Sequence, residues 1–407
     1  MELKVGYKNT ELGIIPDEWD EVQLKDYIKI NSGESPSRFL FIDKGVPYFK
    51  VEQLNNSSKF QINTPYYISY NKSVNKGSII FPKRGAAILL NKIRILNQNS
   101  FMDTNLMTLT VYNPSLFNEY LFYYLTYKGL SHVADTTSVP QINNKHINPF
   151  KIPLPPLPEQ TAIATVLSDT DSLIQALEKK IAKKQLIKKG AMQKLLTLKE
   201  GWENSLLEDV CDRIGVGLAT SVTKYYRNSG TPIIRNLNIK DGYFDGTKML
   251  FLDKDFANAN MSKAAKANDV LTVHTGSNIG LTCVLPEEFN NCQTFTTLIT
   301  TPKKSVLTPY YLSLHMSSSK GKIEIDRLQV GGGKGNLNTG DLKNYNIAFP
   351  KSIEEQNHIT NILSDMDSEI KVLEKKLAKY KELKQGLMQN LLTGKIRLLS
   401  GVKRRLV

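Results

Sequence analysis

The stretch PLPPLPEQTAIATVLSDTDSLIQALEKKIAKK, residues 153–184, decides how this chain is organised. Four prolines stand within its first six residues, and a charged, strongly periodic segment follows them without a break. Proline restricts the preceding residue to extended backbone, so the helix is expected to begin where the proline-rich part ends. The prolines therefore close one globular part and set the direction in which a long helix leaves it.

The same device occurs a second time in FPKSIEEQNHITNILSDMDSEIKVLEKKLAKY, residues 349–380. Residues 159–197 align with residues 355–393 at a constant offset of 196, and 22 of the 39 paired positions are identical. Both copies contain LEKK, and they close with MQKLLT and MQNLLT. Agreement of this extent at a fixed period indicates an internal duplication, so the chain is predicted to hold two similar units.

Apolar residues recur at seven-residue spacing in both copies, which is typical of a coiled coil. The expected seams include Ile163, Leu167, Ile174, Leu177 and Ile181, and then Ile359, Leu363, Ile370, Leu373 and Leu377. The repeated Ser-Asp dipeptides are interpreted as helix-start and surface residues rather than as metal ligands. Because the order is globe, helix, globe, helix, an antiparallel pair is the easiest arrangement. A helix of about 35 residues would be ~52 Å long, or about 15 base pairs of DNA, so the pair would act as a ruler.

The globular parts resemble each other more faintly. PDEWDEVQLKDY is similar to KEGWENSLLEDV, VPYFKVEQLN to TPIIRNLNIK, NKGSIIFPKRG to KANDVLTVHTG, and QINNKHI to NLNTGDL. Short β-branched runs between turn residues predict mixed β-structure, with one helix in residues 116–129 and another in residues 307–321. The predicted fold is α+β, with two mixed α/β domains separated by the two long helices and related by a pseudo-two-fold axis.

The predicted boundaries follow from these patterns. They are residues 1–152 for the first domain, 153–198 for the proline junction and first helix, 199–348 for the second domain, 349–397 for the second junction and helix, and 398–407 for a basic tail.

Composition limits the function classes. The net charge of +14 over 407 residues favours a polyanionic partner, although the excess is spread thinly along the chain. Cys211, Cys283 and Cys292 are expected to be buried and reduced, since three cysteines form no disulfide framework and no CxxC pair suggests zinc. No apolar run approaches the ~18 residues of a membrane span, and the first residues lack the apolar core of a signal peptide, so we expect a cytoplasmic protein.

Several motifs together are similar to those of one known family. ELGIIPDEW, the junctions LPPLPEQ and SIEEQ, the LSDxDSxI helices and MQNLLTGKIRL closely resemble the specificity subunit of type I restriction-modification systems. The resemblance covers essentially the whole chain, and the doubled architecture makes it more specific than any single motif.

The resemblance implies two target-recognition domains that each read one half of a split sequence in double-stranded DNA. It implies that the helices form an antiparallel spacer, on which two methyltransferase subunits dock. Those partners would bind S-adenosylmethionine and methylate adenine N6, and restriction subunits would complete the complex. The chain itself would carry no catalytic site, cofactor or metal. The residues agree, because NPF at 148–150 lacks the second proline of an amino-methyltransferase motif, and neither GVGLAT nor GGGKGN completes a nucleotide-binding fingerprint.

Candidate DNA contacts are cations placed in or beside loops, because base edges and phosphates are read by such side chains. Lys50 and Arg235 carry most weight, since they occupy equivalent places in the two copies. For each candidate, a solvated surface charge is the ordinary alternative. The candidates are Arg38, Lys50, Lys83 and Arg84 in the first domain, and Lys224, Arg227, Arg235 and Lys334 in the second.

Two other functions fit parts of the pattern. The chain could serve a fused methyltransferase-nuclease instead of a three-subunit enzyme, and neighbouring genes or a co-purified partner would separate the two. It could also be a two-headed coiled-coil scaffold for proteins. Salt separates that alternative, since DNA binding weakens steeply as salt rises.

Overall fold

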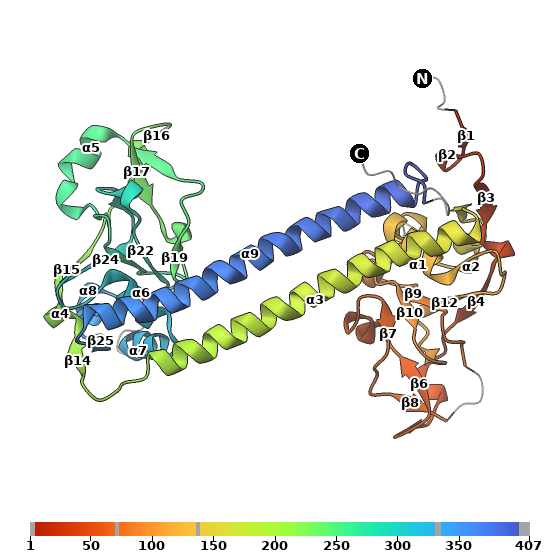
Figure 1. The fold of residues 1–407 in the computed structure, drawn as a ribbon, viewed down its shortest axis with the longest axis horizontal. Helices are drawn as coiled ribbons and strands as arrows, with labels where there is room; N and C mark the ends of the chain where they lie inside the picture. The colour runs from red at the N-terminus through yellow and green to blue at the C-terminus, as the bar shows by residue number, and fades with distance from the viewer. Residues whose placement is uncertain (1–4, 70–72, 136–138, 330–334, 399–407) are drawn as a thin grey trace. The chain divides into compact units, whose positions relative to one another are not determined.

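The computed structural model describes residues 5–69, 73–135, 139–329 and 335–398. The chain divides into two compact units: unit 1 holds residues 1–178 and 375–407, and unit 2 holds residues 179–374. Two long helices, α3 (Leu157–Leu195) and α9 (Ile353–Leu391), are each shared between the units (Figure 1). Each unit therefore consists of a mixed α/β domain and a part of both long helices.

Unit 1 is built on two sheets, ordered β4-β12-β9-β10-β7 and β11-β6-β8-β5. Two ribbons, β1-β2 and β13-β3, accompany them. The strands are β1 (Tyr7–Thr10), β2 (Gly13–Pro16), β3 (Asp20–Gln23), β4 (Ile28–Ser32), β5 (Phe41–Ile42), β6 (Val46–Phe49), β7 (Phe60–Gln61), β8 (Tyr67–Ile68), β9 (Ile79–Pro82), β10 (Arg94–Leu96), β11 (Phe101–Met102), β12 (Leu106–Val111) and β13 (Lys151–Leu154). The helices are α1 (Asn118–Lys128) and α2 (Asn144–Ile147).

In unit 2, the four-stranded sheet β15-β24-β21-β22 repeats the order β4-β12-β9-β10, and β23-β17-β20-β16 repeats β11-β6-β8-β5. The ribbon β14-β25 repeats β3-β13, and a further ribbon is β18-β19. The strands are β14 (Trp202–Leu206), β15 (Cys211–Val216), β16 (Tyr226–Arg227), β17 (Thr231–Ile234), β18 (Ile239–Lys240), β19 (Tyr243–Phe244), β20 (Leu250–Leu252), β21 (Val270–Val273), β22 (Thr282–Val284), β23 (Gln293–Thr294), β24 (Thr297–Pro302) and β25 (Asn346–Pro350). The helices are α4 (Leu207–Val210), α5 (Lys254–Ala259), α6 (Pro309–Ser317), α7 (Ser319–Gln329) and α8 (Thr339–Lys343). The duplication seen in the sequence is thus also a duplication of strand order, and α1 and α6 confirm the two predicted domain helices.

The long helices pair antiparallel, as predicted, and the predicted seam is buried at Ile163, Leu167, Ile359 and Leu363. Charged residues in the seam form ion pairs between the two helices, and the residues that pair in unit 1 are aligned with those that pair in unit 2. Asp171 lies 2.6 Å from Lys384 in unit 1, and Asp367 lies 2.5 Å from Lys188 in unit 2. The helix-start role expected for the Ser-Asp dipeptides is wrong, because the helices begin near the prolines, several turns earlier, and leave these carboxylates in mid-helix.

The two tryptophans occupy matching places, but their carboxylate partners differ in environment. Trp19 Nε1 donates to Glu159 at 3.0 Å, and Trp202 Nε1 donates to Glu355 at 3.3 Å. The Glu159 side chain is 4% exposed, while that of Glu355 is 41% exposed. Only Glu159 is enclosed by a returning segment of the chain.

That segment, residues 394–398, holds Glu159 through charged and backbone donors. Arg397 donates to both Glu159 oxygens at 2.8 Å and to Glu18 at 2.7 Å, and the Leu398 N–H donates to Glu159 at 3.1 Å. Burial alone would raise the pKa of the Glu159 carboxyl, but the hydrogen bonds from Arg397, Trp19 and Leu398 outweigh it and hold the pKa below 4.5. We call this arrangement the Glu159 node.

His315 of α6 makes unit 2 sensitive to acid. Burial lowers the pKa of this imidazole to about 4 from 6.5, and its Nδ1 lies 2.8 Å from the Tyr345 hydroxyl. Since the unfolded chain takes up the proton first, the stabilisation is complete above pH 6.5 and is lost as pH falls toward 4. We expect unit 2 to lose about 3 kcal/mol over this range.

Hydrogen exchange of unit 2, measured at pH values across that window, would show the loss. The variant His315→Gln should show a flatter dependence, and an unchanged slope in this variant would contradict the assignment. Unit 1 serves as an internal control, because the buried Tyr124 takes the place of His315 on α1.

The cysteines were predicted to be buried thiols, and the long helices were predicted not to span a membrane. All three cysteines are free and buried, as predicted, and burial raises the pKa of Cys211 and Cys283 to about 12 and that of Cys292 to about 11. Among the helices of the described ranges, none has the length and apolar character needed to cross a membrane.

Candidate nucleic-acid interface

In each unit, three segments meet at one point, which we call the strand crossing. In each unit, the segment that follows the first strand of one sheet (β4 or β15) bonds to the parallel strand pair of the other sheet (β11 and β6, or β23 and β17). The bonds of unit 1 are Glu34 N to Met102 O at 3.0 Å and Asp103 N to Phe49 O at 3.0 Å, and those of unit 2 are Leu218 N to Thr294 O at 2.7 Å and Phe295 N to Ile234 O at 2.9 Å. The candidate side chains leave the backbone at or near this crossing.

Glycine makes the crossing possible. A Cβ atom at Gly33 would lie 1.9 Å from the Asp103 carbonyl oxygen, and one at Gly217 would lie 1.9 Å from Thr294 Oγ1. Gly217 belongs to GVGLAT, so its glycine serves this close backbone approach. Sequence reasoning missed the pair, although the two glycines directly follow β4 and β15.

We expect Gly33→Ala to destabilise unit 1 by about 1–3 kcal/mol or more, because the new methyl group meets backbone that cannot rotate away. Urea unfolding compared with wild type would measure the loss. Gly190→Ala is the matched control, since a Cβ at this helical glycine meets nothing within 4 Å. The free energy of unfolding of that variant should rise by about 0.5–1 kcal/mol. An equal loss of stability in both variants would show that the close approach at the strand crossing is not the cause of the loss in Gly33→Ala.

Lys50 and Arg235 occupy the same backbone position, as the repeat suggests. Each follows the strand of the crossing and precedes a 3₁₀ helix, Val51–Asn55 or Asn236–Asn238. The Lys50 N–H donates to Gln53 Oε1 at 2.8 Å, and the Arg235 N–H donates to Asn238 Oδ1 at 3.0 Å. An identical capping contact therefore fixes the backbone from which both cations extend.

The two side chains rest on different supports. Lys50 Nζ lies 3.7 Å from the Tyr66 ring centroid, whereas Arg235 Nη2 donates to the Lys248 carbonyl at 2.8 Å. Lysine over an aromatic face presents a point charge, while the Arg235 guanidinium, which donates from Nη2 to a carbonyl, still has N–H donors on Nη1 for an acceptor. The same frame thus carries two different recognition groups.

Lys83 and Arg84 follow β9, beside the segment that leads into α2. The Ile142 N–H donates to the Lys83 carbonyl at 2.8 Å, and the backbone of Arg84 forms an antiparallel β-bridge with that of Gln141. Burial and the neighbouring Arg84 lower the pKa of Lys83, and Asp103 opposes this.

Unit 2 has His274 and Thr275 at the places of Lys83 and Arg84. The Leu337 N–H donates to the His274 carbonyl at 3.0 Å, and the backbone of Thr275 forms an antiparallel β-bridge with that of Asn336. The backbone arrangement is the same, but the basic pair of unit 1 is replaced by an imidazole and a hydroxyl.

The other candidates lie in or beside the edge strands β5 and β16, or outside the described residues. Arg38, 70% exposed, pairs with Glu34 at 3.1 Å just before β5. Arg227 pairs with Asp253 at 3.3 Å in β16, and Lys224 Nζ lies 4.9 Å from the Tyr225 ring. Lys334 falls in a segment that the structure does not describe. The structure thus groups Lys50 and Lys83 near one crossing and leaves Arg38 and Arg227 at the sheet edge.

The junction between the domain and the long helices differs between the units. In unit 1, Lys59 fills it: its Nζ lies 2.6 Å from Glu119 and 2.8 Å from Ser168, and it lies 5.0 Å from the Tyr123 ring. In unit 2 the corresponding space is an open cavity of about 600 Å³ between α3, α6, α9 and β19.

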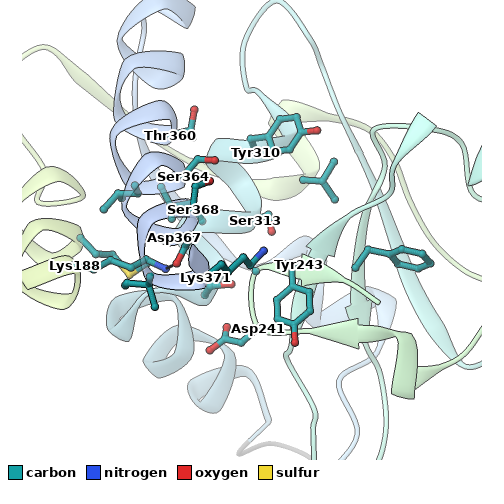
Figure 2. Close-up of a pocket in the computed structure, with 18 of the residues that line it drawn as sticks. Lys188, Asp241, Tyr243, Tyr310, Ser313, Thr360, Ser364, Asp367, Ser368 and Lys371 are labelled. Atoms are coloured by element: carbon teal, nitrogen blue, oxygen red, sulfur yellow. Dashed lines mark hydrogen bonds and ion pairs between the residues drawn. The ribbon is translucent and has the colours of Figure 1, made fainter. Parts of the chain in front are cut away.

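Figure 2 shows the cavity of unit 2, where Lys371 of α9 extends toward Tyr243 and Asp367 faces Lys188. Lys371 Nζ lies 5.2 Å from the Tyr243 ring centroid. At this junction, Lys59 of the domain in unit 1 is thus replaced in unit 2 by Lys371 of the long helix α9. Sequence reasoning missed this exchange, because the two lysines are not at aligned positions.

The comparisons with known proteins agree on one family. The sequence model of the type I restriction modification DNA specificity domain matches residues 16–188 and again residues 199–382. The MjaVIII specificity subunit of a type I restriction enzyme from Methanocaldococcus jannaschii is 27% identical over 421 residues, which cover 94% of each chain. The EcoBI specificity subunit from Escherichia coli is 23% identical over 432 residues, covering 94% of this chain and 87% of its own.

Solved structures share the fold. The S subunit of the type I restriction-modification system from M. genitalium superposes with a TM-score of 0.59 at 14% identity, covering 96% of this chain and 98% of its own. A chain from a structure of a type I R-M system gives a TM-score of 0.60 at 17% identity, with coverage of 94% and 99%. Two repeated domains on paired long helices are therefore a shared architecture.

Proposed function

We propose, because the chain belongs to the family of type I restriction modification DNA specificity domains, that its two units read the two halves of a split DNA sequence. The observation that carries the proposal is the pair of equivalent positions with different side chains. Lys50 of unit 1 is equivalent in position to Arg235 of unit 2, and Lys83 is equivalent to His274. Equivalent hydrogen bonds fix the backbone at both pairs of positions. A common frame with exchanged donors is what two readers of different half-sites need.

We further propose that two methyltransferase subunits dock on the chain and bring in restriction subunits. Large apolar side chains stand exposed along the long helices, which supports docking there. They are Leu173, Leu186 and Ile187 of α3 and Val372 and Leu383 of α9. Under this proposal the partners bind S-adenosylmethionine and methylate adenine N6, and this chain contributes recognition alone.

A methylome of the host, read with the gene intact and deleted, tests the function. Loss on deletion of a split motif with N6-methyladenine in both halves would support the proposal and identify the sequence. A methylome that deletion leaves unchanged would count against it and favour the protein scaffold. Co-purified partners would then distinguish a three-subunit enzyme from a fused methyltransferase-nuclease.

We expect Arg235→Ala to weaken recognition of one half-site only. A lost bidentate base contact would reduce discrimination at that half by about 1–3 kcal/mol. Lys50→Ala is the reciprocal control and should affect the other half-site. Binding competition with duplexes altered in one half at a time measures both, and equal losses at both halves would assign Arg235 a general structural role.

A further inference from the structure

A tight turn in unit 1 exposes two adjacent leucines. Leu89 and Leu90 are each 63% exposed, between Ile88 and Ile93, which are 3% and 2% exposed. Backbone bonds from Leu89 N to Ala86 O, Leu90 N to Ala87 O and Asn91 N to Ile88 O close the turn at 3.1–3.3 Å. The leucines are therefore held outward on a fixed backbone, and we call this feature the Leu89–Leu90 turn.

The turn is also fastened from the side. Asn91 has a positive φ of 48° and donates from its side chain to the Thr126 carbonyl of α1 at 2.8 Å. The two buried isoleucines anchor its ends in the core of unit 1. An exposed apolar pair on such a rigid support gains nothing for folding, so it points to a partner.

Unit 2 lacks this feature at the equivalent place. The connection between β9 and β10 covers residues 83–93, whereas the one between β21 and β22 covers residues 274–281, three residues fewer. There Gly280, with a φ of 82°, takes the turn position of Asn91 directly after the partly buried Ile279. The insertion adds the exposed leucines to one unit only.

The surroundings of the turn identify the chemistry of the partner. Residues 83–94, KRGAAILLNKIR, contain four cations and no carboxylate. Another cation, Lys128, is the last residue of α1, the helix whose Thr126 carbonyl accepts from Asn91. The carboxylate of Asp135, which forms a β-bridge with Gln141, is already paired with His146 at 3.1 Å. An apolar tip in a segment that carries Lys83, Arg84 and Lys92 and no carboxylate fits a base step between two phosphate backbones better than it fits a protein surface.

We propose that the Leu89–Leu90 turn inserts into the DNA duplex at the half-site read by unit 1, parting one base step and kinking it. The inference rests on the proposed function and deepens it. Wedges of this kind kink DNA by roughly 20–90° and act most easily at flexible pyrimidine–purine steps. Unit 1 would then read the deformability of a step in addition to base edges, and unit 2 would not.

The test uses the full chain assembled with its methyltransferase and duplexes that carry the methylated motif. A 2-aminopurine probe is moved through both half-sites, and its fluorescence rises where stacking is lost. We expect a rise at the adenine taken out for methylation in each half, and a further rise at one step in the half read by unit 1. The double variant Leu89→Ala/Leu90→Ala should lose the further rise and most of the bend measured by energy transfer between the duplex ends.

The controls separate the possible failures. Ile14→Ala removes an apolar side chain of unit 1 that is 55% exposed on β2, and it should leave the signal unchanged. A further rise that persists in the double variant would overturn the inference, and so would loss of methyltransferase from the double variant without DNA, which would mark a protein-docking surface. Failure of the wild-type complex to bind the motif would instead contradict the proposed function.

Discussion

Glu159→Ala is expected to destabilise unit 1 by about 3 kcal/mol, at the lower end of the cost of removing one partner from a buried ion pair. The carboxylate accepts from Trp19, Arg397 and the Leu398 N–H, and its side chain is 4% exposed. Without it, the Trp19 indole and the Leu398 amide lose their acceptor, and Arg397 retains Glu18 as its carboxylate partner. Urea unfolding in a Trp202→Phe background, where Trp19 is the remaining tryptophan, measures unit 1 by fluorescence.

Glu355→Ala, measured in a Trp19→Phe background so that Trp202 reports on unit 2, is the matched control. Its carboxylate holds the equivalent indole at 3.3 Å, but Lys199 is 3.7 Å away and the side chain is 41% exposed. Exposed ion pairs contribute about 0–1 kcal/mol, so this variant should lose far less stability. Similar losses at both positions would show that the indole contact, common to both, carries the effect, and that the returning segment 394–398 does not.

Insertion of one heptad into both long helices is expected to move the proposed half-sites apart and leave their sequences unchanged. Placed after Glu178 and after Glu374, where the chain passes from one unit to the other, the insertions keep the seam in phase. Seven residues add about 10 Å, or roughly three base pairs. Binding to the original site should fall toward the non-specific level, a loss of about 10³ or more.

The methylated motif of the inserted variant, read from genomic DNA, is the measurement. A longer spacer between unaltered halves is the expected result, and an unaltered spacer would rule out the ruler. A four-residue insertion at the same two places is the control, since four residues are not a whole heptad and put the apolar seams of the two halves of each helix out of phase.

The duplication and the paired helices were predictable because both depend on repeated local patterns. The heptads identified Leu167 and Leu363 as seam residues, and the short matches identified Lys50 and Arg235 as equivalent. In each case the signal is contained in a few neighbouring residues, and the duplication doubles it.

What could not be predicted depends on contacts between distant residues. Gly33 meets the Asp103 backbone, Lys59 meets Ser168 of α3, and Arg397 meets Glu159. No local pattern indicates such pairs. The Lys59 and Arg397 contacts also differ between the units, so alignment of the repeats conceals them. The roles of the eight candidate cations in DNA binding remain predictions, because the structure places seven of them without a bound duplex.

The division of the chain has a consequence for its synthesis. Unit 2 is one continuous stretch, residues 179–374, whereas unit 1 needs residues 375–398 to supply its part of α9 and the Arg397 contact. A ribosome adding about 5–20 residues per second completes unit 2 before it delivers these residues. The domain made first is therefore completed only after unit 2, because its core includes Met388, Leu391 and Leu392.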